Sequence, residues 1–96
     1  MVTCTALQKV REGKEADLTR LMQELTENVR AHEPGCTLFL WVRSKTAPRA
    51  YLVIEQYVDD RAWEFHRDTD YLKAVIPHLM TCLERDPELA MFEAVE

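Results

Sequence analysis

One histidine is a candidate for proton transfer near neutral pH. A helix over this segment is expected to carry Ala62, Phe65 and His66 on one face, which would turn the imidazole toward the protein interior. Histidine is the side chain whose ordinary pKa lies closest to neutrality, which suits a general acid or base. A hydrogen-bonded core histidine would have the same pattern. His32 ends a helical stripe, and His78 falls outside the apolar pattern, so we expect His78 to be exposed.

Several aromatic side chains could form a pocket for a planar ligand, because each combines a large flat surface with one polar atom. In so small a domain the same residues could simply fill the core. The candidates are Trp41, Tyr57, Trp63 and Tyr71. Glu55 interrupts an otherwise apolar strand, where a carboxylate needs a partner. We therefore expect Glu55 to make an ion pair or hydrogen bonds that tie elements together, rather than to act as a catalytic base.

Composition and missing motifs exclude several classes of function. The 96 residues include 17 acidic and 12 basic side chains, and the net charge of -5 repels phosphate backbones and anionic lipid headgroups. We therefore expect neither a nucleic-acid nor a membrane partner. There is also no glycine-rich phosphate loop, no His-Glu-x-x-His and no metal-ligand spacing, so we expect no bound metal. Three widely spaced cysteines predict reduced thiols in a cytoplasmic protein. Of the three, Cys36 is the best candidate for a reactive thiol, since it follows a Pro-Gly turn, although simple packing is the more common role of a free cysteine.

Hydrophobic periodicity predicts elements in the order β-α-β-β-α-β. Apolar residues recur at helical spacing from Glu15 to Glu33, and Pro34 ends this helix, with Gly35 expected to adopt a positive φ. Asp59 or Asp60 could cap a second helical region, which restarts near Thr69. The first helical stripe consists of Leu18, Leu21, Met22, Leu25 and Val29. The expected strands are residues 2–10, 37–42, 50–58 and 88–95.

This order is typical of a single α+β domain, residues 1–96, with the ferredoxin-like fold. Both helical regions would cover one face of a four-stranded antiparallel sheet. In the strand at 37–42, apolar side chains point to both sides of the sheet. Those on one side are Leu38, Leu40 and Val42, and those on the other are Phe39 and Trp41. A chain of this length cannot cover both faces, so we predict a homodimer through the open sheet face.

Short motifs in a fixed order resemble those of the antibiotic biosynthesis monooxygenase domain. The first is Glu33-Pro34-Gly35-Cys36 after the long helix, and the second is Ile54-Glu55-Gln56-Tyr57 at a strand end. Asp59-Asp60, Phe65-His66 and Leu72-Lys73 follow in that order. The resemblance spans Gly13 to about Leu83 and implies a dimeric α/β barrel.

Two departures fall at positions expected to line the pocket. Members of the family commonly have Glu-x-Trp where this chain has Glu55-Gln56-Tyr57, and many have a histidine followed by an aromatic residue where it has Tyr71-Leu72. These differences bear on the substrate more than on the fold.

The resemblance implies a monooxygenase that needs no cofactor. In such an enzyme O₂ reacts with the electron-rich carbanion of a phenolic, quinol or polyketide-type aromatic substrate, and the protein supplies shape, desolvation and a proton acceptor. His66 would be the base or hydrogen-bond partner, and Trp41, Tyr57, Trp63 and Tyr71 would bind the substrate.

Two other functions stay open. Relatives that isomerise a phosphorylated autoinducer share the Tyr57 and Phe65-His66 pattern, and such an isomerase would need cationic side chains at the pocket mouth. The available cations are Arg43, Arg49, Arg67 and Lys73. A dimeric ligand-binding module without turnover would need neither a base nor access for O₂.

Overall fold

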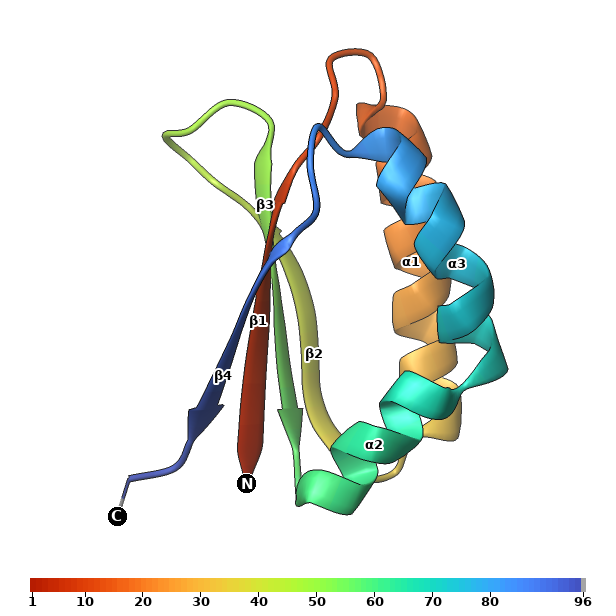
Figure 1. Ribbon diagram of the computed structural model, residues 1–96, viewed down its shortest axis with the longest axis vertical. Helices are drawn as coiled ribbons and strands as arrows, with labels where there is room; N and C mark the ends of the chain where they lie inside the picture. The colour runs from red at the N-terminus through yellow and green to blue at the C-terminus, as the bar shows by residue number, and fades with distance from the viewer. Residues whose placement is uncertain (96) are drawn as a thin grey trace.

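The computed structural model describes residues 1–95 and has a four-stranded antiparallel sheet with three helices on one face (Figure 1). The elements are β1 (Val2–Lys9), α1 (Glu15–His32), β2 (Cys36–Arg43), β3 (Ala50–Tyr57), α2 (Asp60–Asp68), α3 (Asp70–Cys82) and β4 (Glu88–Glu93). The strands lie in the order β2-β3-β1-β4, and every neighbouring pair is antiparallel. The predicted α+β, ferredoxin-like fold is confirmed.

The long helix α1 supplies much of the core. All five residues of its predicted stripe are buried, with exposed fractions between 0% for Leu18 and 8% for Leu21. The helix ends where predicted, because Pro34 disfavours a helical conformation of the residue before it. That residue, Glu33, is the C-cap, and its backbone N–H donates to the Val29 carbonyl at 2.9 Å.

The turn after α1 differs from the prediction at Gly35. The glycine with a positive φ is Gly13, at 87°, and Gly35 does not lie in that region. Gly35 is needed instead for a close approach, because a Cβ at this position would lie 2.6 Å from the Cβ of Ala62 in α2. The missing side chain therefore lets α2 pack directly on the start of β2.

The second helical region consists of two helices that meet at Thr69. Asp59 caps α2, since its Oδ1 accepts the Ala62 N–H at 2.9 Å, as the sequence predicted. The Thr69 hydroxyl donates to the His66 carbonyl at 2.8 Å and closes the end of α2. This break turns α3 back along α1, so that the two helices lie side by side over the sheet (Figure 1).

The two faces of the sheet have different surroundings. On the helix-facing side, alternate residues of β3 such as Tyr51, Val53 and Glu55 are buried. No described element covers the opposite face, which is therefore open to solvent, and many of its side chains are apolar. Its most exposed apolar side chains are Leu7 at 41%, Leu40 at 39%, Val42 at 40% and Phe92 at 53%.

Candidate active site

His66 is buried and held at one nitrogen by a carboxylate. It lies in α2 with 5% of its surface exposed, and its Nδ1 is 3.0 Å from each carboxylate oxygen of Glu33. A carboxylate only accepts hydrogen bonds, so Nδ1 carries a hydrogen and donates it to Glu33. This contact fixes the ring orientation and leaves Nε2 as the nitrogen that can exchange a proton.

The other nitrogen faces a second carboxylate. Nε2 of His66 lies 3.4 Å from Oε1 of Glu55, within ion-pair range but longer than a well-formed hydrogen bond. The Tyr57 hydroxyl donates to the same Glu55 oxygen at 2.6 Å. Glu55 thus has the partners expected for a buried carboxylate, and they come from its own strand and from α2.

A fifth residue completes this hydrogen-bonded network. The Tyr71 hydroxyl, from α3, donates to Oε2 of Glu33. Glu33 is 4% exposed and sits at the C-terminal end of α1, where the helix dipole opposes a negative charge. Donors from α2 and α3 therefore stabilise a carboxylate that its own helix destabilises, and the network joins three helices to β3.

Burial sets which of these groups can exchange protons. Burial raises the pKa of the Glu55 carboxyl, and the Tyr57 hydrogen bond and the His66 charge lower it by less. Burial also raises the pKa of the Tyr57 and Tyr71 hydroxyls well above the ordinary range, with Glu55 and Glu33 adding to the effect respectively. Burial and the Glu55 charge raise the pKa of the Cys4 thiol to about 11. The phenols and this thiol therefore stay protonated at neutral pH and do not serve as proton acceptors.

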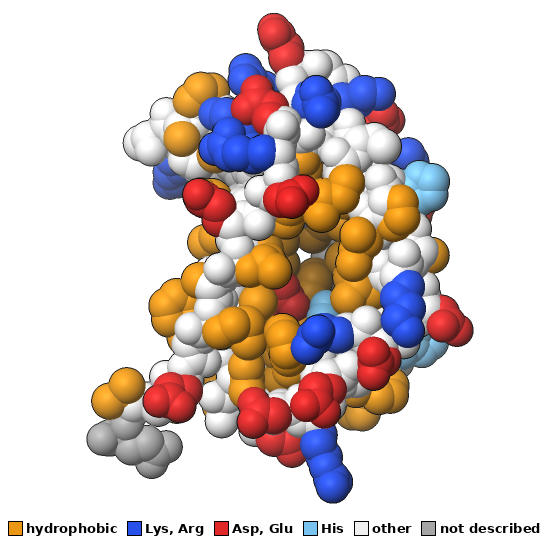
Figure 2. Space-filling model, viewed as in Figure 1, with side chains coloured by type: hydrophobic (Ala, Val, Ile, Leu, Met, Phe, Trp, Pro, Cys, Tyr) orange, Lys and Arg blue, Asp and Glu red, His pale blue; other side chains and the backbone are white. Residues whose placement is uncertain are grey.

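A cavity of about 400 Å³ opens onto this network between the sheet and the helices. Its walls are mainly apolar and include Phe39 from β2 and Ile76 and Leu79 from α3. Figure 2 shows the hollow ringed by hydrophobic side chains, with an acidic side chain and a histidine inside it. An apolar cavity with few polar groups is typical of a site for a small, largely hydrophobic ligand.

The predicted site residues lie at different distances from this cavity. His66 and Trp63 line it, and the Arg67 guanidinium stacks 4.5 Å from the Trp63 ring centroid. Tyr57 has no exposed surface and lies behind Glu55, with its ring centroid 5.4 Å from that of His66. Tyr57 therefore supports the site without forming its wall.

The remaining two aromatic residues lie elsewhere. Tyr71 lines a larger hollow, of about 610 Å³, on the outer side of α1 and α3, and reaches the network through Glu33. Trp41 stacks on Tyr51, with ring centroids 4.7 Å apart, and its indole N–H donates to Gln8 at 2.9 Å. Neither is among the residues that line the cavity beside His66.

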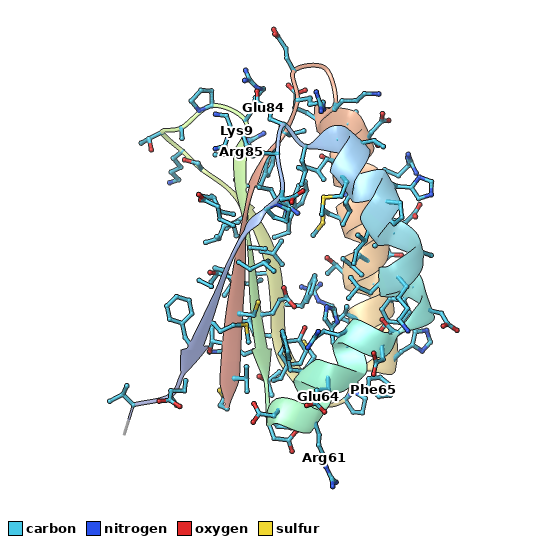
Figure 3. All side chains as sticks on the ribbon, viewed as in Figure 1. Lys9, Arg61, Glu64, Phe65, Glu84 and Arg85 are labelled. Carbon is cyan, nitrogen blue, oxygen red and sulfur yellow. The ribbon has the colours of Figure 1, made fainter. Side chains whose placement is uncertain are left out.

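One expectation about α2 was wrong. His66 points inward as predicted, but Phe65 does not share its face: 56% of Phe65 is exposed, and it lies on the outer side of α2 together with Glu64 (Figure 3). Adjacent residues of a helix are about 100° apart around its axis, so burying His66 turns Phe65 toward solvent.

Sequence reasoning missed two of the buried polar residues, Glu33 and Gln8. Glu33 was assigned only to the end of α1, although an acidic residue at a helix C-terminus opposes the dipole and so indicates a compensating partner. Gln8 is 4% exposed and lines the cavity from β1. The residues around Gln8 in the sequence do not indicate that it is buried, because its hydrogen-bond partners Trp41 and Met22 are remote in the chain.

Two further features concern the described part of the chain. Within residues 1–95, no three or more His, Cys, Asp and Glu side chains are grouped so that they could hold a metal ion. None of the helices in the same range combines the length and apolar character required to cross a membrane.

Comparison with known proteins places this chain and its fold in a family. The sequence profile of the antibiotic biosynthesis monooxygenase family matches residues 1–77. No curated protein sequence matches the chain closely enough to count as a relative.

Solved structures agree with the profile. A Caulobacter crescentus CB15 protein named after the antibiotic biosynthesis monooxygenases is 33% identical, with a TM-score of 0.94 over 99% of this chain and 90% of that one. A Deinococcus radiodurans protein of similar name is 23% identical, with a TM-score of 0.90 over 100% and 94% of the two chains. A conserved Methanosarcina mazei Go1 protein is 22% identical, with a TM-score of 0.90 over 95% and 89%. The last two show the shared fold, and with the profile match and the Caulobacter structure the chain belongs to the antibiotic biosynthesis monooxygenase family.

Proposed function

We propose that this protein is a cofactor-independent monooxygenase of a small phenolic, quinol or polyketide-type aromatic substrate. The observation that carries the proposal is His66, held between Glu33 and Glu55 at the wall of an otherwise apolar cavity of about 400 Å³. Family membership supports a monooxygenase-like module. A titratable pair in a desolvated cavity suits abstraction of a phenolic proton.

The cavity walls favour a flat, apolar ligand. Phe39, Trp63 and Leu79 offer apolar and aromatic contact, while the Arg67 guanidinium stacks on the Trp63 ring and limits its movement. A substrate hydroxyl in the cavity could hydrogen-bond to both Nε2 of His66 and Oε1 of Glu55, because these atoms are 3.4 Å apart and share no well-formed hydrogen bond.

Proton transfer in this proposal uses His66 and Glu55 together. Nδ1 of His66 stays bound to Glu33, so the ring does not rotate when Nε2 gains or loses its proton. Because burial raises the pKa of Glu55, this carboxyl and Nε2 compete for the same proton. The substrate hydroxyl gives its proton to this pair, and the resulting phenolate carries the charge.

The substrate itself supplies the electrons for oxygen reduction. In an anthrone-type substrate a CH₂ group becomes C=O: one oxygen atom of O₂ enters the carbon, and the other leaves as water with the two hydrogens. Four electrons leave the substrate and reduce one O₂, so no external reductant is required. The protein holds the ring, excludes water and accepts the first proton.

The assembly and location form part of the same proposal. The open apolar sheet face would be covered in a homodimer, because exposed side chains such as Leu40 and Phe92 lie on it without any covering element. All three cysteines are unpaired, which suits a reducing, cytoplasmic environment.

The phosphorylated-substrate alternative has one supporting observation. Of the four cations that could bind a phosphate, Arg67 lines the cavity, whereas Arg49 pairs with Glu84 at 3.1 Å. A single cation stacked on Trp63 beside two carboxylates is a poor phosphate site, so we favour the aromatic substrate. A ligand-binding module without turnover would bind the same aromatic compounds without consuming O₂.

The experiment is oxygen uptake on dihydroxynaphthalenes, anthrones and simple hydroquinones without added cofactor. His66→Ala should lower kcat/KM by at least ~10²-fold, the lower end of the contribution of a general base. His78→Ala is the matched control, because His78 is exposed and lies outside the cavity. Unchanged turnover in a folded His66→Ala protein would refute the role of His66, and binding without oxygen uptake by the unmodified protein would favour the binding module.

A further inference from the structure

Gln8 is a buried polar residue that the proposed proton transfer does not use. It lies in β1, is 4% exposed and lines the same cavity as His66 and Glu55. A buried side-chain amide needs hydrogen-bond partners for both its oxygen and its NH₂ group, because leaving either unpaired is unfavourable. The partners of Gln8 therefore indicate what the cavity offers a ligand.

Trp41 fixes the orientation of the Gln8 amide. The indole N–H can only donate, and it lies 2.9 Å from Oε1 of Gln8. Trp41 is itself held by stacking on Tyr51, with an angle of 11° between the ring planes. The amide oxygen must face the indole, so the NH₂ group faces the other way.

The NH₂ group has only a weak partner among the described residues. Nε2 of Gln8 lies 3.6 Å from Sδ of Met22, and a thioether sulfur is a poor acceptor. The group carries two hydrogens, and neither has an oxygen acceptor among residues 1–95. A ligand oxygen in the cavity would supply the missing hydrogen-bond acceptor for the Gln8 NH₂ group.

The position of Gln8 sets the length of such a ligand. Cys4 pairs with Glu55 across β1 and β3, and Gln8 lies four residues further along β1 on the same face. At the usual rise per residue of a strand, Gln8 is ~13 Å along the sheet from Cys4, and therefore from the level of Glu55. A single ring is too short to reach from Glu55 to Gln8, whereas two or three fused rings with an oxygen at each end fit.

We propose that Gln8 is a specificity-determining residue that donates Nε2–H to an oxygen at the end of a fused-ring aromatic ligand opposite its reacting hydroxyl. This inference rests on the proposed function for the identity of the reacting end. It assigns the cavity two polar ends, with a proton acceptor at His66 and Glu55 and a hydrogen-bond donor at Gln8.

The test compares two ligands of the same shape under nitrogen, where no turnover occurs. The first is 6-acetyl-2-naphthol, and the second is 6-isopropenyl-2-naphthol, which replaces the carbonyl oxygen with a CH₂ group and keeps the planar geometry. The unmodified protein should bind the acetyl compound roughly three- to tenfold more tightly, as expected for one hydrogen bond. Equal affinity for the two, or no binding of either, would overturn the proposal without any variant.

Two variants separate ligand recognition from a structural role. Gln8→Met keeps the size of the side chain and removes the donor, and Gln8→Glu keeps an acceptor for Trp41 while removing the NH₂ group. Both should abolish the preference for the acetyl compound. Gln23→Leu, a change at an exposed glutamine of α1, should keep it. Equal weakening of both ligands by the Gln8 variants would show a structural role only and overturn the proposal.

Oxygen uptake distinguishes this inference from the proposed function. A preference that depends on Gln8, together with no oxygen consumption on either naphthol or on the anthrones, would retain the ligand site and refute the monooxygenase. Oxygen consumption by a protein that shows no preference for the acetyl compound would support the monooxygenase and refute the ligand contact at Gln8.

Discussion

Glu55 is a residue at which function and stability oppose each other. Its carboxyl is buried beside Tyr57 and His66, and this burial raises its pKa. The folded protein therefore favours the protonated form, and ionising Glu55 lowers the free energy of unfolding. Residues retained in spite of such destabilisation are often functional.

Glu55→Gln should be more stable than the unmodified protein at neutral pH and should lose activity. A raised folded-state pKa gives stability that is complete below the unfolded pKa and is lost as pH rises through the folded pKa. A glutamine cannot ionise, so the advantage of the variant should grow as pH increases from 5 to 8. Urea unfolding across this range measures it, with the exposed Glu64→Gln as control. A variant less stable at every pH would contradict the prediction.

Cys4 should contribute to loss of stability at alkaline pH. It is 5% exposed, and burial and the Glu55 charge raise its pKa from 9.0 to about 11. The unfolded chain releases this proton first, so stability falls between these two values, by roughly 2 to 3 kcal/mol. Cys4→Ala should show a shallower fall from pH 8.5 to 10.5 in urea unfolding. If the free energy of unfolding falls equally with pH in both proteins, Cys4 does not contribute to the alkaline loss of stability.

At the scale of elements, Gly35 sets how closely α2 approaches β2, and α2 carries His66. A Cβ on Gly35 would meet the Cβ of Ala62 at 2.6 Å, and Ala62 lies one helical turn before His66. Gly35→Ala should lower the free energy of unfolding by about 1–3 kcal/mol, as overpacking does. It should also reduce oxygen uptake, because relieving the clash displaces α2.

The double variant Gly35→Ala, Ala62→Gly isolates this contact. Removing the Ala62 Cβ relieves the clash, although glycine within a helix costs about 1 kcal/mol by itself. The double variant should therefore be more stable than the sum of the two single changes predicts. Additive effects in urea unfolding would show that the close approach is not the reason for a glycine at position 35.

The elements could be predicted from sequence because each rests on a local pattern. The stripe of α1, the Asp59 cap and the strand alternation of β2 depend on neighbours within a few residues. The site could be predicted only in part, since Glu33 meets His66, and Trp41 meets Gln8, across 33 residues of chain. Long-range partners leave no periodic trace, which is why His66 was identified and Glu33, which orients its ring, was not.

At the scale of the whole molecule, the fold covers only half of its sheet. The three helices and the core lie on one face, and the molecule measures 39 × 30 × 18 Å. On the other face the apolar residues extend over β1, β2, β3 and β4, from Leu7 and Leu40 to Ile54 and Phe92. A second copy of the chain, which carries the same apolar face, is the partner that we propose.

Leu40→Asp should therefore convert a dimer into monomers. In the proposed dimer the carboxylate would be buried without a partner in the interface, whereas in the monomer it remains exposed to water on the open face. Light scattering should give twice the chain mass of 11.2 kDa for the unmodified protein and the chain mass for the variant. Phe65→Asp is the matched control, because Phe65 is 56% exposed on the opposite, helical side and should leave the dimer intact. An unmodified protein of 11.2 kDa at micromolar concentration, or a Leu40→Asp protein that stays dimeric, would rule out the open sheet face as the interface.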